Sequence, residues 1–528
     1  MKKNSQEKEI KDMKRMKKIM ALMLAAIMMM AMSVTAFADE GVEKGTLTVN
    51  VKEGQTLANQ AVNIYKLFDM TVSGTNYGYK VNSIYMPILD QVLGAGFTDK
   101  TDQGYYDAVK NATDTDNGTN TQKFANDFTK ELLKYNKEHP GQMIKETSTK
   151  SFGKDATDTT FNVDGLDFGY YLVCQTGTKE IQSSLVPVVG ATATVNLKTQ
   201  APDITKTADN DATTVYVGQT VTYTITGQVP DMTGYSNYVY KIHDTLTDGL
   251  DFVKNEAGNV VVTVKIGETA YDDVVGVISK DNARKMTIDL SEKVKTADTG
   301  AEIKVTYQAK VNKNAIVETK NSATLEYSNK PGTEETGTTK PSEVVTPTYP
   351  LDVKKTDTKD TMLAGAHFKL YASTTDGNID KNKVIKVTKD VENTDGKYTY
   401  AANQSAEDAI DEMVTVANKI DEQGYNLHIN GLAEGTYYLV ETKAPDGFNK
   451  LTAPVVIKIT KSADTDVNKW TISKDGTVEN DKIIDIENST GSLLPSTGGR
   501  GAIAFAVIAA LLVFGVAVSF IRDKRKEA

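Results

Sequence analysis

The chain of 528 residues contains one cysteine, Cys174, so no disulfide can form within it. Its four histidines (His139, His243, His367 and His428) are scattered and lack the spacing of metal ligands. The sequence also lacks a Gly-rich phosphate loop, a Ser-His-Asp arrangement and an HExxH motif. We therefore expect no metal, no cofactor and no turnover of an external substrate.

Positive charge is not in excess, because 60 Lys and Arg residues stand against 70 Asp and Glu residues. No basic stripe with interleaved aromatic residues is present, which argues against nucleic acid as a partner. Thr, Val, Lys, Asp and Gly dominate instead, in short alternating runs bounded by turn residues. This composition predicts an all-β extracellular protein.

Long hydrophobic runs are confined to the two ends of the chain. Residues 1–18 are rich in Lys and Arg, residues 19–32 are apolar, and small residues at positions 36 and 38 follow. This order predicts a signal peptide over 1–38, cleaved between Ala38 and Asp39. Exported proteins often rely on disulfides. Without them, this chain must be stable by core burial alone or through another covalent link.

The C-terminal hydrophobic run, residues 502–521, is long enough to cross a membrane as a helix, and a basic tail follows it. Alone, these features predict a permanent single-pass anchor. The residues in front of the run are Leu494, Pro495, Ser496, Thr497 and Gly498. They resemble the LPxTG sorting signal of Gram-positive surface proteins, so 490–528 is interpreted as a sorting segment. The resemblance implies that a sortase attacks the Thr497 carbonyl and that the membrane-held form is transient.

Two segments of the chain repeat. LANQAVNIYKLF near residue 57 is similar to LAGAHFKLY near residue 363, and the stretch 163–173 is similar to 430–440. Both copies show the period-2 alternation of strands. We therefore expect related β-sandwiches at 45–199 and 350–489. The first should carry a helical insert over about 98–148, since KFANDFTKELLKYNKEH has apolar residues at helical spacing.

The region 200–330 contains four alternating runs, namely TVTYTITGQV, VVVTVKI, IKVTYQAKV and SATLEYSN. They predict a middle sandwich of the immunoglobulin-like type. The segment 331–349 is rich in Pro, Gly, Thr and Glu, and is interpreted as a linker of limited flexibility. The fold expected is thus all-β, with three sandwiches in tandem.

The stretch YYLVETKAPDGF at 437–448 matches the pattern YxLxETxAPxGY except for its final aromatic residue. It resembles the E-box of sortase-assembled pilins and of CnaB-type domains, which form internal Lys–Asn isopeptide bonds. The resemblance implies that Lys355 is the reactive amine, Asn488 the partner amide and Glu441 the catalytic acid. Burial would favour the neutral amine that such a reaction needs. Strand lysines and surface glutamates without this role are the plain alternative.

In the first sandwich, Cys174 follows the YYLV sequence at the place where Glu441 follows it in the last. A thiol is a poor replacement for a carboxyl group that must donate and recover a proton. We therefore expect no bond of this kind in the first domain, and interpret Cys174 as a small buried apolar residue.

The middle domain resembles the CnaA-type modules of the same pilins. The resemblance implies Lys206 as the amine and Asp244 as the acid, with Asn321 or Asn329 as the amide. Asp244 could instead be a turn-forming residue before Gly249. The three sandwiches are thus expected to be CnaB-type, CnaA-type and CnaB-type.

Backbone pilins of this family carry an acceptor lysine in a VYPK-type motif between the first two domains. Here the junction reads TVNLKT, so Val195 and Lys198 keep the spacing while Asn196 and Leu197 replace Tyr and Pro. The resemblance implies Lys198 as the acceptor, although a solvated lysine at a domain junction would look the same.

Together these resemblances imply a major pilin subunit, joined from Thr497 to Lys198 of the next copy. Its expected partners are copies of itself, pilin-type and housekeeping sortases, peptidoglycan and accessory pilins. Its expected location is the cell surface, secreted and covalently anchored to the cell wall. Two alternatives remain open: a singly anchored adhesin that binds a host matrix ligand, and an accessory pilin.

Overall fold

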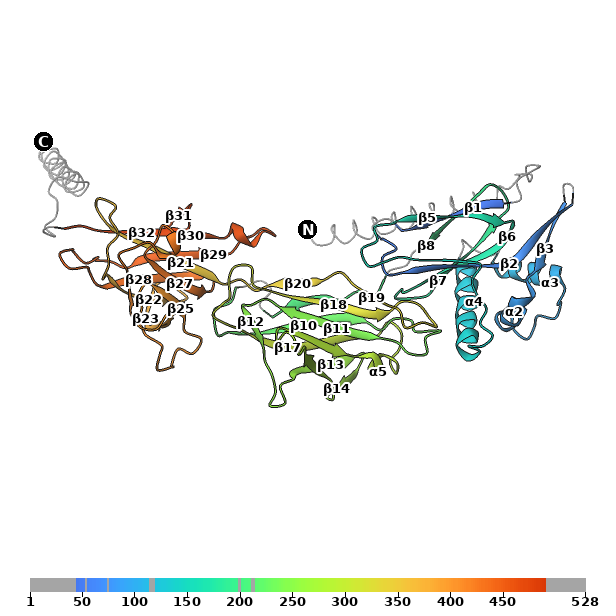
Figure 1. Ribbon diagram of the computed structural model, residues 1–528, viewed down its shortest axis with the longest axis horizontal. Coiled ribbons are helices and arrows are strands. Elements are labelled where there is room, and N and C mark those ends of the chain that lie inside the picture. The colour runs from blue at the N-terminus through green and yellow to red at the C-terminus, as the bar shows by residue number, and fades with distance from the viewer. Residues whose placement is uncertain are drawn as a thin grey trace, which may run out of the picture. The chain divides into compact units, whose positions relative to one another are not determined.

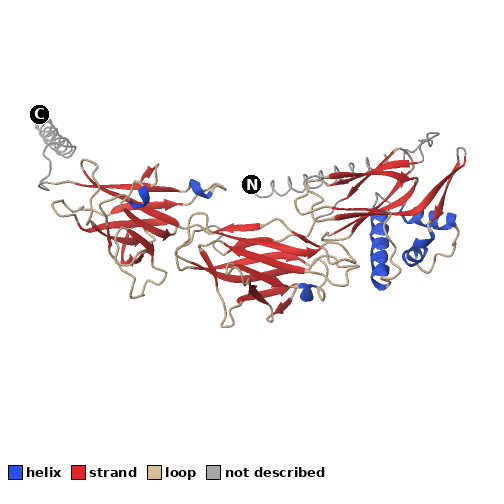
Figure 2. Cartoon of the chain, viewed as in Figure 1, coloured by secondary structure: helices blue, strands red, loops and turns tan. Residues whose placement is uncertain are grey.

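The computed structural model describes residues 44–490, except 53–54, 74–75, 114–118, 198–200 and 210–213. The described chain divides into two compact units that meet between Pro347 and Thr348. Strands dominate both units, and the longer helices belong to the first (Figures 1 and 2). The expected all-β class with a small helical part is confirmed.

The first unit begins with a two-sheet sandwich. Its strands are β1 (Lys44–Val51), β2 (Ala61–Ser73), β3 (Asn76–Val81), β4 (Ser148–Ser151), β5 (Thr160–Asp167), β6 (Gly169–Thr176), β7 (Gln182–Val188) and β8 (Thr192–Leu197). One sheet has the order β5-β1-β8 and the other the order β3-β2-β6-β7, with β4 paired to β2. Alternating apolar residues such as Val49, Ile64 and Val173 fill the space between the two sheets.

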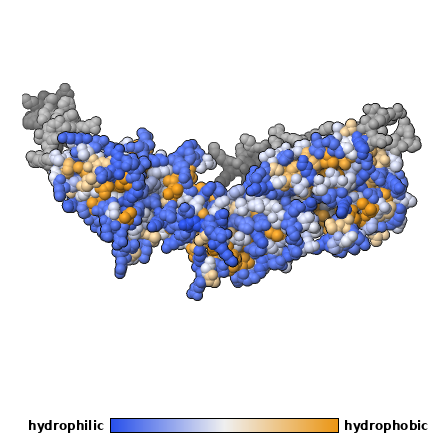
Figure 3. All heavy atoms as spheres, viewed as in Figure 1, coloured by the Kyte–Doolittle hydropathy of each residue, from blue (hydrophilic) through white to orange (hydrophobic). Residues whose placement is uncertain are grey.

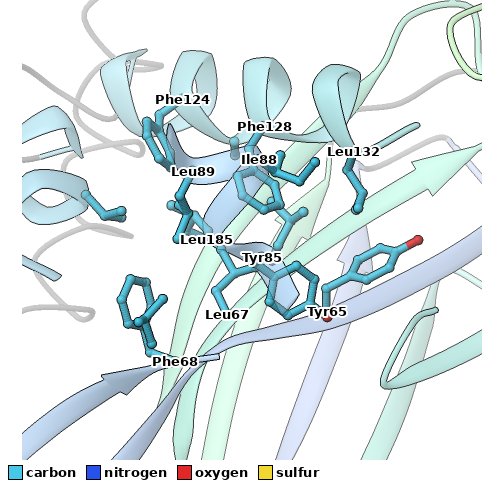
Figure 4. Close-up of a cluster of buried hydrophobic side chains, with 14 of the residues drawn as sticks. Tyr65, Leu67, Phe68, Tyr85, Ile88, Leu89, Phe124, Phe128, Leu132 and Leu185 are labelled. Atoms are coloured by element: carbon cyan, nitrogen blue, oxygen red, sulfur yellow. The ribbon is translucent and has the colours of Figure 1, made fainter. Parts of the chain in front are cut away.

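Helices cover the other face of the β2–β6–β7 sheet (Figure 4). They are η1 (Ser83–Tyr85), α2 (Met86–Leu93), α3 (Asp102–Thr113) and α4 (Thr119–Glu138). Phe124, Phe128 and Leu132 recur every four residues and form the buried stripe of α4. The helical insert expected over 98–148 is therefore found in α3 and α4, whereas α2 lies before it and was missed.

The second sandwich of this unit contains β9 (Thr205–Ala208), β10 (Thr220–Gln228), β11 (Tyr240–Leu246), β12 (Leu250–Phe252), β13 (Val260–Ile266), β14 (Thr269–Tyr271), β15 (Val275–Ile278), β16 (Lys285–Asp289), α5 (Ser291–Val294), β17 (Glu302–Val311), β18 (Lys320–Ser328), β19 (Thr336–Thr338) and β20 (Ser342–Val345). One layer has the order β9-β10-β17-β13, and the other contains β15, β16, β11 and β18. The four predicted runs correspond to β10, β13, β17 and β18.

The segment 331–349 is not the linker that its composition indicated. Its strands β19 and β20 both pair with β18, and Asn321 lies opposite Val344. Within the same unit, Asn59 Nδ2 of the first sandwich donates to the Thr338 carbonyl at 2.7 Å. Backbone pairing to a free edge overrides the turn-like composition of this segment, so it completes the sandwich.

The second unit is a sandwich with strands β21 (Tyr349–Asp357), β22 (His367–Ser373), β23 (Ile379–Ile385), β24 (Val387–Lys389), β25 (Lys397–Tyr400), β26 (Met413–Val414), β27 (Leu427–Leu432), β28 (Gly435–Lys443), β29 (Val455–Thr460), β30 (Thr471–Lys474), β31 (Thr477–Glu479) and β32 (Ile483–Asn488), and with 3-10 turns η2 (Ile420–Glu422) and η3 (Val467–Lys469). One sheet has the order β24-β25-β27-β21-β32, and the other the order β23-β22-β28-β29-β30-β31. The first and last strands, β21 and β32, are parallel neighbours.

Hydrophilic residues cover most of the described surface seen in Figure 3, and hydrophobic residues appear there in separate groups. Exposed apolar side chains include Val261 and Val277 of the second sandwich. Scattered exposure of this kind is ordinary for folded domains. The unusual polar chemistry lies in the interiors of the second and third sandwiches.

Candidate functional site

The middle sandwich buries a lysine between its two layers. Lys206 enters from β9, while Asp244 and Asn321 enter from β11 and β18 of the facing layer. The side chains of Lys206 and Asp244 are both 0% exposed, and Asn321 is fully buried. Lys206 Nζ lies 2.5 Å from Asp244 Oδ2. The structure thus brings together three residues that the sequence indicated.

Burial changes the protonation of this lysine and this carboxyl in opposite directions. It lowers the pKa of Lys206 and raises the pKa of Asp244, although their mutual attraction opposes both changes. Within the described residues, Asp244 Oδ1 and Asn321 Oδ1 are buried oxygens that lack a hydrogen-bond partner. A proton on the Asp244 carboxyl would convert one unpaired acceptor into a donor.

Tyr307 of β17 was not identified from the sequence. Its hydroxyl donates to Asp244 Oδ2 at 2.5 Å and accepts from Asn321 Nδ2 at 2.8 Å. It also contacts Lys206 Nζ. The alternation of IKVTYQAKV places Tyr307 on the inward face, yet an inward tyrosine is ordinarily a core residue, so the pattern alone could not mark it.

Asn329, the alternative amide, lies elsewhere. It follows the end of β18, eight positions beyond Asn321, which corresponds to roughly 27 Å along an extended strand. Its backbone N–H donates to the Glu335 carbonyl at 3.3 Å. Only Asn321 of the two candidates is in contact with the Lys206 cluster.

The last sandwich buries a second set of the same residue types. Lys355 of β21, Glu441 of β28 and Asn488 of β32 are 0%, 2% and 1% exposed. Asn488 Nδ2 donates to Glu441 Oε1 at 2.9 Å, and the Leu451 N–H donates to Glu441 Oε2 at 2.7 Å. Lys355 pairs with Ile486, so Lys355 and Asn488 are diagonal neighbours on one face of the sheet.

The hydrogen bonds of the buried Lys355 amine go to backbone carbonyls rather than to a carboxylate. Its Nζ donates to the Ile486 carbonyl at 3.3 Å and to the Thr356 carbonyl at 3.5 Å. Burial lowers the pKa of Lys355 to about 8, and the nearby Glu441 charge opposes the change. About a tenth of this amine is therefore neutral, and nucleophilic, at pH 7, far more than of an ordinary lysine.

Asn426 holds the backbone on both sides of Lys355. Its Oδ1 accepts from the Lys355 N–H at 2.7 Å, and its Nδ2 donates to the carbonyls of Lys355, Leu363 and Val416 at 3.3, 3.1 and 2.9 Å. The side chain is fully buried. It replaces ladder hydrogen bonds where β21 leaves β27, and thereby fixes the position from which Lys355 extends.

We expect Asn426→Ala to lower the free energy of unfolding of the second unit by roughly 3 kcal/mol, because several buried backbone groups lose their partners. Trp470, the single tryptophan of the chain, lies in this unit and reports its denaturation by fluorescence. Asn382→Ala, at an exposed position, is the matched control. Equal midpoints for the two variants would contradict this role.

The first sandwich differs from the last at the corresponding positions, and the structure corrects the alignment used for Cys174. Val62 of the first sandwich corresponds to Phe368 of the last in the repeated segments. Val62 pairs across the sheet with Gln175, and Phe368 pairs with Glu441. Tyr171 and Tyr437 each donate to the carbonyl four residues earlier, at 2.5 and 2.8 Å. Gln175, rather than Cys174, therefore stands at the Glu441 position.

In the first sandwich Val51 of β1 pairs with Leu197 of β8, and in the last sandwich Lys355 of β21 pairs with Ile486 of β32. Val51 therefore stands at the position that corresponds to Lys355. The first domain thus has neither the amine nor the carboxyl. Cys174 is fully buried and packs in the core beneath the helices, as expected. Burial raises the pKa of its thiol to about 12, so it is not a nucleophile near neutral pH.

The predicted processing residues lie outside the described part of the chain. These are Ala38 and Asp39, Lys198, and the sorting residues 494–498. Among the residues that the structure describes, no helix is long and apolar enough to span a membrane. The predicted membrane segment 502–521 is not among them.

Comparison with known proteins relates part of the chain to a described domain. A family model described as a SpaA prealbumin-like fold domain matches residues 349–474. A fimbrial subunit type 1 of Actinomyces viscosus is 34% identical over 112 residues, which cover 19% of this chain. The alignment spans 18% of the length of that relative.

Two solved structures of pilins are similar over most of the chain. The T6 backbone pilin of serotype M6 Streptococcus pyogenes is 15% identical with a TM-score of 0.44, covering 85% of this chain and 99% of that one. The major pilin SpaA of Corynebacterium diphtheriae is 16% identical with a TM-score of 0.44, covering 84% and 100%. The segment 349–474 that the family model matches contains Lys355 and Glu441, and Asn488 lies beyond its end.

Proposed function

We propose that this chain is the major structural subunit of a surface pilus, polymerised covalently and stabilised by internal Lys–Asn amide bonds. One observation carries the proposal: two separate sandwiches each bury a lysine with a carboxyl and an asparagine. The sets are Lys206, Asp244 and Asn321, and Lys355, Glu441 and Asn488. The resemblance of 349–474 to SpaA-type domains and the fimbrial relative support the same assignment.

In each set, the neutral lysine amine would attack the asparagine Cγ, and ammonia would leave as the new amide forms. Burial favours the neutral amine, and the buried carboxyl can polarise the asparagine carbonyl and transfer protons. The folded sandwich holds the groups together, so the reaction needs no diffusional encounter. Each domain reacts once with itself, which makes this protein structural material rather than an enzyme.

The mechanical consequence follows from the strands that are joined. Lys355 and Asn488 lie on the first and last strands of their sandwich, more than a hundred residues apart in the chain. By the chain-entropy argument used for disulfides, closing such a loop stabilises the fold by roughly 5 kcal/mol. A tether between terminal strands also prevents force applied at the two ends from unravelling the residues between them. These bonds take the place of the disulfides that the chain lacks.

Polymerisation would use the segments at the ends of the folded region. A pilin-type sortase would cleave after Thr497 and join its carbonyl to Lys198 of another copy. A housekeeping sortase would attach the base of the fibre to peptidoglycan, with accessory pilins as further components. The protein would be secreted, held transiently in the membrane and then anchored covalently in the cell wall.

Co-expression of the full chain with a pilin-type sortase tests this proposal. We expect a ladder of oligomers that survives boiling in SDS, and we expect Lys198→Ala to abolish it because the acceptor amine is lost. Lys52→Ala, which removes an exposed lysine from the same domain, is the matched control and should leave the ladder intact.

A wild-type chain that is attached to the cell wall only as single copies would overturn the assignment as a major pilus subunit and favour the anchored adhesin. A ladder that persists in Lys198→Ala would retain the fibre but exclude Lys198 as the acceptor. An accessory pilin would join the fibres of another subunit and form no ladder with itself.

A further inference from the structure

One phenol contacts every reacting group of the middle sandwich. The Tyr307 hydroxyl contacts Lys206 Nζ, accepts from Asn321 Nδ2 at 2.8 Å and donates to Asp244 Oδ2 at 2.5 Å. It therefore lies between the nitrogen that would attack and the nitrogen that would leave. Tyr307 is 2% exposed, so solvent has little access to replace it.

We propose that Tyr307 is a catalytic residue of bond formation in the middle domain, relaying a proton from the Lys206 amine to the departing nitrogen of Asn321. This inference rests on the proposed Lys206–Asn321 bond. The Lys206 nitrogen forms a bond to Asn321 Cγ and must lose one proton. The Cγ–Nδ2 bond breaks, and Nδ2 must gain one proton to leave as ammonia. The phenol gives its proton to Nδ2 and takes one from Nζ, so it is regenerated and charges balance.

The ionisation of Tyr307 suits a relay. Burial and the adjacent Asp244 raise the pKa of its hydroxyl well above the ordinary value. The phenol is therefore neutral at physiological pH, and it carries a proton that it can give only as it receives another. A permanently ionised group could accept the Lys206 proton but would have none ready for the leaving nitrogen.

In the last sandwich, the asparagine nitrogen that would leave contacts a carboxyl group directly. There Glu441 Oε1 accepts directly from Asn488 Nδ2 at 2.9 Å, so the carboxyl itself contacts the leaving nitrogen. In the middle domain Asn321 Nδ2 donates to the Tyr307 hydroxyl at 2.8 Å, and Asp244 also interacts with the Asn321 side chain. The two domains of one chain thus differ in that a phenol accepts from the asparagine nitrogen only in the middle domain, and the last domain serves as an internal reference.

Tyr307→Phe tests the relay, because it removes the hydroxyl and keeps the ring that packs against Tyr223 and Phe252. The full chain is synthesised in a cell-free system, denatured at successive times and digested, and the joined peptides are quantified by mass spectrometry. We expect the Lys206–Asn321 peptide to form at least about 100-fold more slowly, as when a general acid–base group is lost. The Lys355–Asn488 peptide should form at the wild-type rate.

Tyr223→Phe is the matched control. Tyr223 also lies beside Lys206, with its ring centroid 5.1 Å from Nζ, but its hydroxyl contacts Thr346 at 3.4 Å. This variant should form both bonds at the wild-type rate. Equal loss of the Lys206–Asn321 peptide in both variants would indicate a packing role and overturn the relay.

The outcomes separate this inference from the proposed function. A wild-type chain without the Lys206–Asn321 peptide would refute the bond itself, whereas a Tyr307→Phe chain that forms it at the wild-type rate would refute only the relay. Hydrogen exchange of β10 and β17 shows whether Tyr307→Phe folds. If the Tyr307→Phe variant does not fold, a chain with a fluorinated tyrosine at position 307 tests the relay. The fluorinated residue keeps the hydroxyl, but the hydroxyl has a lower pKa. The relay predicts a changed rate of bond formation there, and an unchanged rate refutes it.

Discussion

In Glu441→Ala we expect the Lys355–Asn488 bond to be missing while the Lys206–Asn321 bond still forms. Glu441 Oε1 is the group that contacts Asn488 Nδ2, so its removal takes away the proton transfer that ammonia release needs. The intact mass should then be one ammonia below the mass calculated from the sequence of the processed chain, whereas the wild type should be two below. Peptide mapping should assign the remaining bond to the middle domain.

The same variant should lose much of the stability of the second unit. Loss of the covalent loop costs roughly 5 kcal/mol, and the buried Lys355 amine remains without the Glu441 charge that offsets its burial. Thermal unfolding followed by Trp470 fluorescence should show a transition at a much lower temperature than in the wild type.

Glu487→Ala is the matched control, since this exposed carboxylate lies one residue before Asn488 on the same strand. It should form both bonds and unfold as the wild type does. A wild-type mass equal to the sequence mass would refute internal bonds altogether. A Glu441→Ala chain two ammonia units below its sequence mass would show that Glu441 is dispensable.

A chain that keeps Lys355 but cannot form the bond should become more stable as the pH rises. In Asn488→Ala the amine stays free and buried, and its folded-state pKa of about 8 lies below its ordinary value of 10.5. Between these values the unfolded chain binds more protons than the folded one. The free energy of unfolding should therefore increase with pH through this window, by up to about 1.4 kcal/mol per unit. Below pH 8 the destabilisation by the buried ammonium is fully present.

Denaturation of the second unit at a series of pH values measures this slope. The double variant Lys355→Met and Asn488→Ala has no amine to titrate, so its curve subtracts the contribution of all other groups. Equal slopes for the two chains would show that Lys355 is not held in a perturbed, buried state. The proposed bond would convert this amine to an amide in the wild type, so we expect the wild-type curve to follow that of the double variant.

Several sites could be predicted because local sequence carries them. The alternation of β10, β13, β17 and β18 and the four-residue spacing in α4 each report which face is buried. The resemblance of 437–448 to the E-box implied Glu441 and Lys355, and the resemblance of the middle domain to CnaA-type modules implied Lys206. Alternation, helical spacing and short motifs all depend on residues that are close together along the chain, so they can be read from a single sequence.

Other features could not be predicted because they depend on partners distant in the chain. Strands β19 and β20 have a turn-like composition, and they are strands because β18 offers them an edge. Tyr307 acquires its importance only where β17 meets β11 and β18 across the sandwich. The choice between Asn321 and Asn329 likewise depended on which one the fold carries inward.

The two repeated strands show that an alignment error of one residue changes which side chain is compared with Glu441. Matching YYLV to YYLV paired Cys174 with Glu441, a shift of one residue. In a strand, one residue changes the face, so this shift exchanged the helix-covered side of the sheet for the sandwich interior. The cross-strand pair of Val62 and Gln175 sets the correct register.

The sequence alone determined the all-β class, because alternation and turn residues encode it locally. The lysines and carboxyl groups expected to react, and the sorting signal expected near the C-terminus, came from resemblance to known motifs and stay predictions. Tertiary structure alone decided that Asn321 rather than Asn329 joins the Lys206 cluster, that the Tyr307 phenol lies beside it, and that Asn426 supports the backbone of Lys355. These contacts join residues between 14 and 101 positions apart, and their geometry exists only once the sheets have paired and packed.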